Sequence, residues 1–481
     1  MFRGMSEKPN DWTIPAELEA EMTPAVRAFV LMLFERIEKL ESRVVELQDE
    51  VARLRKTPQN SSLPPSSQHP HAKPKPPLKP SGKKRGGQPG HAKCERPLVP
   101  ADQVTETIPL KPQTCRGCGG RLSGSDPAPL RHQVYELPPI EPIITEYQRH
   151  RLACLCCGVT TCAELPGDVP HGQSGPRLVA FTALLMGFFR LSKRRVAMFL
   201  EEVCHIPCSP GLVVKQQNLA TSALRPAYDE LLEQLPRQTL LGIDESPTKE
   251  ANHKAWLWTF VSQNFTAFAL RPTRAATVLE ELLTDDFRGV VTCDRARMYW
   301  RLPWLQWCWS HLRRDFQALV DSGVSSAKRI GTALLEQTRT MFRQHARARD
   351  GTISFSGLKT SLGKVRHAVE RLLLRGLNSR DRRTFELCRE LYGYRERLWM
   401  FLDIEGLEPT NNASERALRH AVIWRKLSFG TQSASGSRFV ETLLSVVETC
   451  RQQARSAFDF VTTALERHFK HHPPPSLMPG V

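Results

Sequence analysis

The sequence of 481 residues has no long uninterrupted hydrophobic run. Its longest apolar stretch, residues 178–189, contains Thr182 and Gly187 and is too short to span a bilayer. Residues 1–4 show no cationic segment leading into an apolar one, so no export signal is expected. Thirteen cysteines are too few for a disulfide-built fold in a chain of this length. These absences predict a soluble, cytoplasmic protein without a membrane partner.

Acidic residues are the minority, with 50 Asp plus Glu against 67 Lys plus Arg and a net charge of +17. Such an excess attracts polyanions, so nucleic acid is the leading partner class and an anionic membrane surface is the alternative. Residues 57–93 contain no acid at all and are rich in Pro and Ser. We expect an extended basic linker at 57–98 that contacts phosphates, or else a plain spacer. The candidate DNA contacts in it are Lys83, Lys84 and Arg85.

A heptad pattern precedes this linker. Hydrophobic residues alternate at intervals of three and four, at Val30, Leu33, Ile37, Leu40, Val44, Leu47, Val51 and Leu54. β-Branched residues at the a positions with Leu at d favour a parallel two-stranded coiled coil. Arg36 would then face Glu41 of a second copy, an attractive pair. The pattern predicts a homodimer, and the alternative is an amphipathic helix packed on its own domain.

Two matching cysteine pairs follow the linker. Each is a C-x-x-C-G motif, Cys115 with Cys118 and Cys154 with Cys157. Four thiolates in two such pairs suit tetrahedral zinc, and the glycine lets backbone amides turn toward sulfur. We therefore expect a structural Zn²⁺ site, with Cys156 or Cys162 as a substitute ligand. A set of reduced, unliganded thiols is the alternative.

Residues 176–235 have a helical pattern. A break at 206–208 is followed by Ser209 and Pro210, which are suited to the cap and first position of a helix. Basic residues 193–195 lie on the preceding helix. This arrangement is compatible with a helix-turn-helix that binds DNA, and a purely structural helical hairpin is the alternative.

Acidic residues end two hydrophobic runs in the middle of the chain. The run 240–243 leads to Asp244, and the run 289–293 leads to Asp294. A hairpin, a helix and a further strand are predicted at residues 255–270, 275–283 and 304–309. Strand, hairpin, helix and strand, with acids at two strand ends, form the layout of a ribonuclease H-like fold. Both carboxylates would then meet at one edge of the sheet.

A third acid is expected on a later helix. Asn411 or Asn412 can cap a helix whose first turns carry Glu415. Three carboxylates suit two Mg²⁺ ions about 3.5–4 Å apart, which activate the nucleophile and stabilise the leaving oxygen in phosphodiester transfer. Further candidate DNA contacts surround this acid: Arg416, Arg419, Arg425 and Lys426. The competing acids are expected to be solvated: Glu245, Asp285, Asp286, Asp315 and Glu408.

Several motifs together resemble the bacterial insertion-sequence sixty-six transposase family. They are G-G-Q-P-G-H at 86–91, the cysteine pairs, G-I-D-E at 242–245, C-D at 293–294, W-S-H-L-R-R-D-F at 309–316, N-N-A-S-E-R-A-L-R at 411–419 and R-K-L-S-F-G at 425–430. The resemblance implies a DDE transposase with Asp244, Asp294 and Glu415 at the catalytic positions. It also suggests His311, in a C-x-x-H element, as an active-site neighbour. Arg295 stands where a small residue is more usual, and it could pair with an acid and perturb the site.

The expected fold is multidomain α/β. Its parts are a coiled coil (25–56), a basic linker (57–98), a zinc-binding module (99–170), a helical region (171–236), a ribonuclease H-like catalytic domain in two pieces (237–316 and 409–470), a helical insertion (317–408) and a mobile tail (471–481). One helix is expected from Arg438 to about Phe469.

The leading hypothesis is a bacterial, nucleoid-associated transposase that cleaves and joins double-stranded DNA at the ends of its element. Accessory proteins of the same element are further candidate partners. The alternatives are a DNA-binding former transposase that no longer cleaves and a ribonuclease H-like nuclease that does not join.

Overall fold

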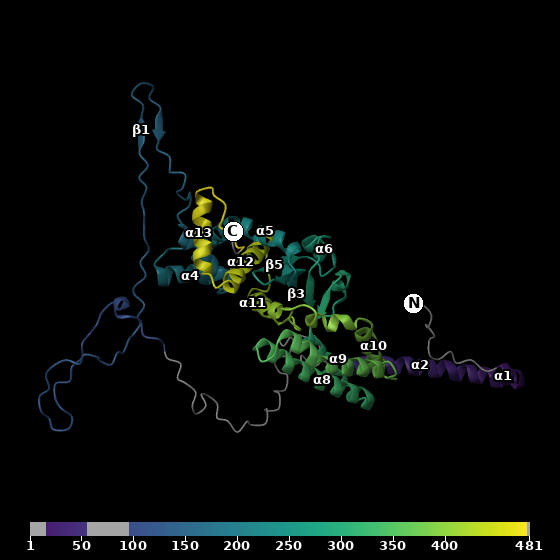
Figure 1. Ribbon diagram of the computed structural model, residues 1–481. Coiled ribbons are helices and arrows are strands. Elements are labelled where there is room, and N and C mark those ends of the chain that lie inside the picture. Colours follow the sequence, from purple (N-terminus) through teal and green to yellow (C-terminus); the bar gives the residue numbers. More distant parts are fainter. Residues whose placement is uncertain (1–15, 55–95, 479–481) are drawn as a thin grey trace. The chain divides into compact units, whose positions relative to one another are not determined.

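A computed structural model describes residues 16–54 and 96–478 (Figure 1). Among these, residues 16–54, 146–201 and 207–478 belong to one unit, and residues 96–145 with 202–206 belong to another. Each unit is described by itself. The described residues contain no helix that is long and apolar enough to cross a membrane.

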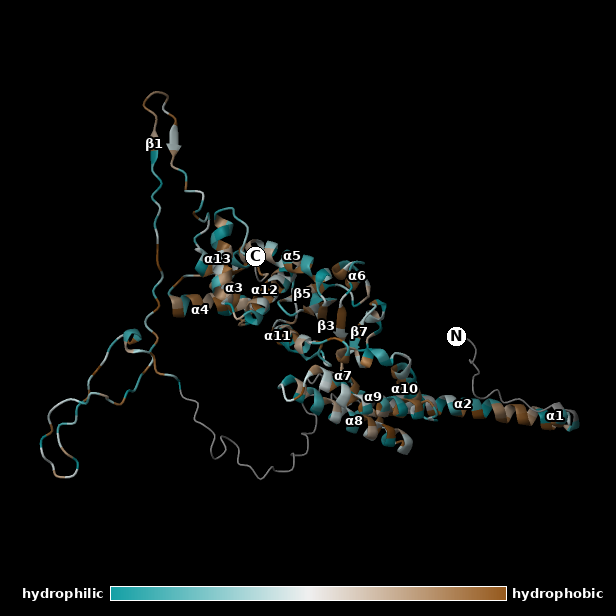
Figure 2. Ribbon diagram, in the orientation of Figure 1, coloured by the Kyte–Doolittle hydropathy of each residue, from teal (hydrophilic) through white to brown (hydrophobic). Residues whose placement is uncertain are grey.

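The heptad region folds as one long helix. After the short α1 (Ala16–Glu21), α2 runs without interruption over Pro24–Leu54. Figure 2 shows hydrophobic and hydrophilic residues mixed along it. Several residues of the predicted seam are exposed on α2: Leu33, Leu40, Val44, Leu47 and Val51. The helix is as expected, and its pairing with a second copy stays a prediction.

A mixed five-stranded sheet forms the core. Its strands are β3 (Leu240–Glu250), β4 (His253–Val261), β5 (Thr266–Arg271), β6 (Val290–Cys293) and β7 (Leu305–Trp307). Their order is β5-β4-β3-β6-β7, with β3, β4 and β5 antiparallel and with β6 and β7 parallel to β3. Helix α6 (Thr277–Leu283) connects β5 to β6. The predicted strands, hairpin and helix are therefore all present.

The sequence suggested a strand that ends at Asp244, but β3 continues to Glu250. The extension is held by β4, which pairs with β3 along the whole length of β4, from Val261 to His253. The parallel partner β6 pairs with β3 only up to Gly242. Asp244 therefore lies in the middle of a strand, just beyond the point where pairing with β6 stops.

Helices that precede the sheet in sequence and helices that follow it pack together in this unit (Figure 1). They are α3 (Pro176–Gly187), α4 (Lys193–Cys204), α5 (Pro210–Gln234), α12 (Ala434–Gln452) and α13 (Ala457–Phe469). Ser209 caps α5 as predicted, accepting a hydrogen bond from the Leu212 amide at 3.1 Å. Helix α5 contacts α3, α12 and β5. Helices preceding and following the sheet in sequence thus share one core.

The predicted single C-terminal helix is two helices. The chain leaves helical geometry at Ala454, which has a positive φ of 54°. Ser456 then caps α13 by accepting from the Asp459 amide at 3.2 Å. The expected mobile tail is also wrong for its last described residues, because the buried Leu477 donates its amide to Glu230 at 3.2 Å.

Strand β5 lies at the edge of the sheet, and α12 covers that edge. Every second residue of β5 points its amide toward α12, where side chains one helical turn apart accept it. The three bonds are Thr266 N to Thr449 Oγ1 (3.1 Å), Phe268 N to Ser445 Oγ (2.8 Å) and Leu270 N to Glu441 Oε2 (2.9 Å). Two strand residues span about 6.7 Å and four helical residues about 6 Å, so the two spacings match. The exposed edge that could pair with another chain is thereby removed.

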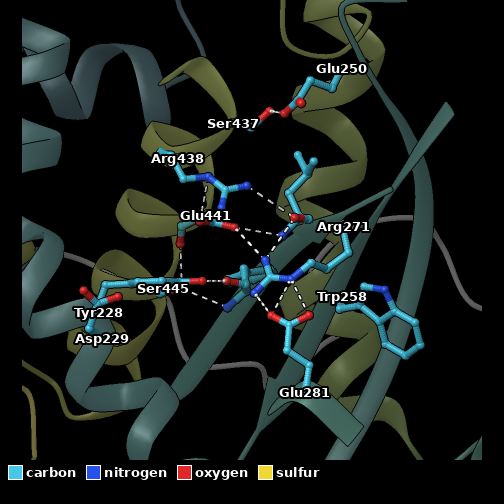
Figure 3. Close-up of polar contacts among 12 residues, drawn as sticks. Tyr228, Asp229, Glu250, Trp258, Arg271, Glu281, Ser437, Arg438, Glu441 and Ser445 are labelled. Carbon is cyan, nitrogen blue, oxygen red and sulfur yellow. Dashed lines mark hydrogen bonds and ion pairs between the residues drawn. The ribbon is translucent and has the colours of Figure 1, made fainter. Parts of the chain in front are cut away.

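Glu441 is the charged member of this row and is fully buried. Its carboxylate lies 3.1 Å from Arg225, 3.1 Å from Arg438 and 3.6 Å from Arg271 (Figure 3). Burial raises the pKa of Glu441, while the Leu270 amide and the arginines act in the opposite direction. A buried carboxylate is tolerated here because α5, β5 and α12 all supply partners.

Four helices lie between Asp294 and Glu415 in the sequence. They are α7 (Trp309–Val320), α8 (Ser325–Arg349), α9 (Phe355–Gly376) and α10 (Arg382–Gly393). Helix α11 (Asn412–Ser428), which carries Glu415, follows them. Helices α7 to α10 contact one another in sequence order, whereas α11 returns to the sheet and contacts β3 and β4.

Candidate functional site

Three acidic residues from distant parts of the chain come together beside β3. Asp244 lies on β3, Asp294 follows β6, and Glu415 lies in the first turn of α11. The pKa of Asp244 is raised well above its usual value, first by burial and then by repulsion from the carboxylates of Glu245, Asp294 and Glu415, in that order. The pKa of Glu415 is also raised, mainly by burial. The predicted trio is therefore brought into one electrostatically coupled cluster.

Close packing of α11 on β3 positions Glu415. A Cβ added at Gly242 would lie 3.0 Å from Asn411 Oδ1 and closer still to Ser414 Oγ, so the lack of a side chain at residue 242 allows this close approach. Asn411 or Asn412 was expected to cap this helix, and Asn411 does occupy the N-cap position. Its Nδ2, however, donates to the Ile243 carbonyl at 2.7 Å, and no side-chain cap bond forms. The side chain is used to join the helix to the strand.

Glu245 was expected to be solvated, and this is wrong. Its side chain is 2% exposed, and its carboxylate accepts Nε of Arg274 at 2.6 Å and the hydroxyl of Tyr299. Arg274 also lies 4.0 Å from Asp294. Burial raises the pKa of Glu245, with a further contribution from Asp294. Sequence reasoning missed Arg274 and Tyr299, because only the fold brings them to this acid.

Arg295 pairs with acids, as expected, but its partners are not Asp244, Asp294 or Glu415. Its guanidinium contacts Asp315 at 2.9 Å and also Glu390 of α10. Asp315 is therefore an ion-pair partner, contrary to the expectation that it would be solvated. The exposed competing acids are Asp285, Asp286 and Glu408.

His311 lies where the motif comparison suggested, beside the third acid. It is in the first turn of α7, and its Nδ1 is 3.6 Å from Glu415 Oε1. Burial and the nearby Arg314 lower the pKa of His311 to about 4. The imidazole is thus neutral near pH 7.

The candidate DNA contacts differ in exposure. Arg416, Arg419 and Lys426 are exposed on α11. Arg425 instead donates to Ser246 Oγ at 2.9 Å and to the Pro247 carbonyl, holding α11 against β3. The other three predicted contacts, Lys83, Lys84 and Arg85, lie outside the described residues.

The acidic cluster has the properties of a site for a hard cation. In the part of the chain that the structure describes, Glu415 Oε1 is a buried atom without a hydrogen-bond partner. Ionising several buried carboxylates together is unfavourable unless a positive charge offsets them. Carboxylate oxygens are the ligands that Mg²⁺ prefers. The residues therefore fit the magnesium that the sequence predicts.

The two cysteine loops have the same backbone geometry. In each, the amide of the glycine donates to the first cysteine's carbonyl at 2.9 Å, and that glycine has a positive φ, 72° at Gly119 and 73° at Gly158. Amides of Cys118 and Gly117 lower the pKa of the Cys115 thiol, and those of Cys157 and Cys156 lower that of Cys154. A lowered pKa favours the thiolate, which is the form that binds zinc. The loop of Cys115 and Cys118 belongs to one unit, and the loop of Cys154 and Cys157 belongs to the other.

Comparison with protein families covers most of the chain. Residues 171–438, more than half of it, match the model described as "Transposase IS66 family". Residues 112–158 match the "zinc-finger binding domain of transposase IS66", and residues 6–97 match a family of unknown function (DUF6444). The zinc-binding character of the cysteine loops is therefore supported independently of their geometry.

Two curated proteins of Sinorhizobium fredii (strain NBRC 101917 / NGR234) are similar over most of the sequence. The "Uncharacterized protein y4qI" is 24% identical over 410 residues, which cover 76% of this chain and 72% of that protein. The "Uncharacterized protein y4hP" is 25% identical over 405 residues, covering 73% and 70%.

Proposed function

Because this chain belongs to the IS66 transposase family, we propose that it cleaves DNA strands at the ends of an insertion sequence and joins them to target DNA. The observation that carries the proposal is the convergence of Asp244, Asp294 and Glu415 from β3, β6 and α11. We assign these three residues as the catalytic carboxylates, with double-stranded DNA as substrate.

The carboxylates of Asp244, Asp294 and Glu415 would hold two Mg²⁺ ions. Bound there, the ions supply Lewis acidity for in-line attack by water or a 3′-hydroxyl and for departure of the leaving oxygen. The chain itself supplies position. Gly242 and Asn411 hold the first turn of α11 on β3, and the exposed Arg416 beside Glu415 would neutralise a DNA phosphate.

We also propose a separate role for each of the other parts of the chain. The sheet order, with three antiparallel strands followed by two parallel ones, supports a ribonuclease H-like catalytic core interrupted by the helical insertion. The exposed seam of α2 supports a parallel coiled-coil homodimer, which could hold two element ends together. Cys115, Cys118, Cys154 and Cys157 would supply thiolate ligands for structural Zn²⁺. The helical region at 171–236 and accessory proteins of the same element would assist DNA recognition.

The test is Mg²⁺-dependent cleavage and joining of labelled duplexes that carry the inverted ends flanking the gene. We expect both activities in the full chain and loss of both in Asp244→Asn. The matched control is Asp286→Asn, because Asp286 is an exposed acid of the same unit.

Binding of the end duplex without cleavage by the unmodified chain would contradict the enzymatic proposal. Cleavage without joining would reduce it to a nuclease. Activity that survives Asp244→Asn would refute the assignment of the site, whatever the reaction.

A further inference from the structure

A second group of metal-binding residues lies beside the carboxylates. Cys308 immediately precedes α7, His311 lies in its first turn, and Glu415 lies in the first turn of α11. The ligand atoms of these three residues all lie within 4.8 Å of one another. In the described part of the chain, this is the one such group found.

Two of these ligand atoms have no hydrogen-bond partner within the described residues. They are His311 Nδ1 and Glu415 Oε1, and both are buried. Their separation of 3.6 Å is too long for a hydrogen bond. Leaving a buried polar atom without a partner destabilises the folded chain. Two ligands of one tetrahedral zinc lie about 3.3 Å apart, so a shared metal would satisfy both atoms with little movement.

The sulfur completes the group. Cys308 is fully buried, and its Sγ accepts the Asn411 amide at 3.2 Å. Amide donors of this kind stabilise a metal-bound thiolate and fix its orientation. Because Asn411 is also bonded to the Ile243 carbonyl, the thiol is tied to the same strand that carries Asp244.

The surrounding charges are mixed. Arg314 and Arg295 oppose a cation here, since both lower the His311 pKa, and Asp294 favours one, since it raises that pKa. Glu415 adds a negative charge, so the donors themselves can balance a divalent ion. Thiolate and imidazole select a borderline-soft ion such as Zn²⁺ or Co²⁺, whereas Mg²⁺ needs oxygen ligands.

We propose that Cys308, His311 and Glu415 form a zinc site distinct from the four-cysteine loops. Glu415 is shared, so zinc held there withdraws it from the carboxylate cluster, and zinc competes with magnesium. This second consequence rests on the proposed function, whereas the zinc site itself does not.

The first experiment measures metal content in the full chain. After equilibration with Zn²⁺ and removal of free ion, elemental analysis of Cys308→Ala should show about one zinc fewer per chain than the unmodified protein. The control is Cys388→Ala, which removes another fully buried thiol, on α10, and should leave the zinc content unchanged. Equal zinc content in Cys308→Ala and the unmodified protein would overturn the site.

Folding is checked with a second variant and a spectroscopic signal. His311→Gln should also bind about one zinc fewer per chain than the unmodified protein. Co²⁺ added to the unmodified chain should give a thiolate charge-transfer band, and this band should be weaker in Cys308→Ala and in His311→Gln. A zinc content that falls only in variants that have also lost cooperative thermal unfolding would refute a specific site.

The competition is tested with Mg²⁺-dependent cleavage of the end duplex. For each protein, the activity with added Zn²⁺ is divided by the activity of the same protein in Mg²⁺ alone. Zn²⁺ should inhibit the unmodified chain and Cys388→Ala but not Cys308→Ala. Equal inhibition of all three would overturn competition at this site. If the unmodified chain shows no cleavage in Mg²⁺, the proposed function falls while the metal content still decides whether the site exists.

Discussion

An alanine at Gly242 would force α11 away from β3. Its Cβ would lie 3.0 Å from Asn411 Oδ1 and closer still to Ser414 Oγ, and both atoms belong to the start of α11. Overpacking by one methyl group costs about 1–3 kcal/mol of stability. The turn that yields to the clash is the one that carries Glu415. We therefore expect Gly242→Ala to impair catalysis more than folding.

The expected loss of activity can be sized from the displacement. Relieving the clash requires a shift of about 1 Å in the first turn of α11, and such a misplacement can lower the rate about 100-fold. That factor corresponds to about 2.7 kcal/mol in the barrier. The rate is measured as Mg²⁺-dependent cleavage of the end duplex, and stability as denaturant-induced unfolding.

A second-site change separates sterics from other causes. Ser414→Ala removes the closest atom, a buried hydroxyl that has no hydrogen-bond partner among the described residues, and should be nearly neutral alone. Combined with Gly242→Ala, it should recover part of the lost rate and stability. The control is Gly376→Ala in the helical insertion. The added Cβ at residue 376 would lie 2.6 Å from the Cβ of Cys388. This substitution should destabilise the chain while leaving the rate of the folded fraction near that of the unmodified protein.

Strict additivity of Gly242→Ala and Ser414→Ala would refute the steric argument. A loss of rate in Gly376→Ala as large as that in Gly242→Ala would show that general destabilisation, and not the position of Glu415, sets the activity.

Three further outcomes are expected. Asp244→Asn should raise Tm in metal-free buffer, and the gain should grow as the pH rises above about 4. Folding raises the pKa of Asp244, so the ionised carboxylate destabilises the folded chain more as the pH increases, and the asparagine avoids this loss. A gain in Tm that is independent of pH would contradict this reasoning. Ser445→Ala should lower the unfolding free energy by about 1–3 kcal/mol, because it leaves the Phe268 amide unpaired, whereas the exposed Ser435→Ala should have little effect in the same denaturation series. Val44→Lys, with a charge in the exposed seam of α2, should abolish self-association in analytical ultracentrifugation, and a dimer that persists would argue against the coiled coil.

Local patterns predicted most elements correctly. The hairpin β4–β5, the strand β6 and the cap of α5 by Ser209 follow from hydrophobic runs and from residues that act on their neighbours. The errors occurred where pairing between distant segments decides. Strand β3 runs past Asp244 because β4 extends it, and the C-terminal helix breaks near Ala454.

For the candidate site, the sequence by itself determined which residue types are present and in what order, including the two acids after hydrophobic runs and the acid in a basic helix. It also determined the paired C-x-x-C-G loops, because their geometry depends only on neighbouring residues. Only the tertiary structure decided how the acids differ. It buried Glu245 against Arg274 and Tyr299, directed Arg295 to Asp315, and left Glu415 facing His311. A side chain's charge is encoded locally, but its burial and partners depend on segments far away in the chain, and these set the pKa of each acid.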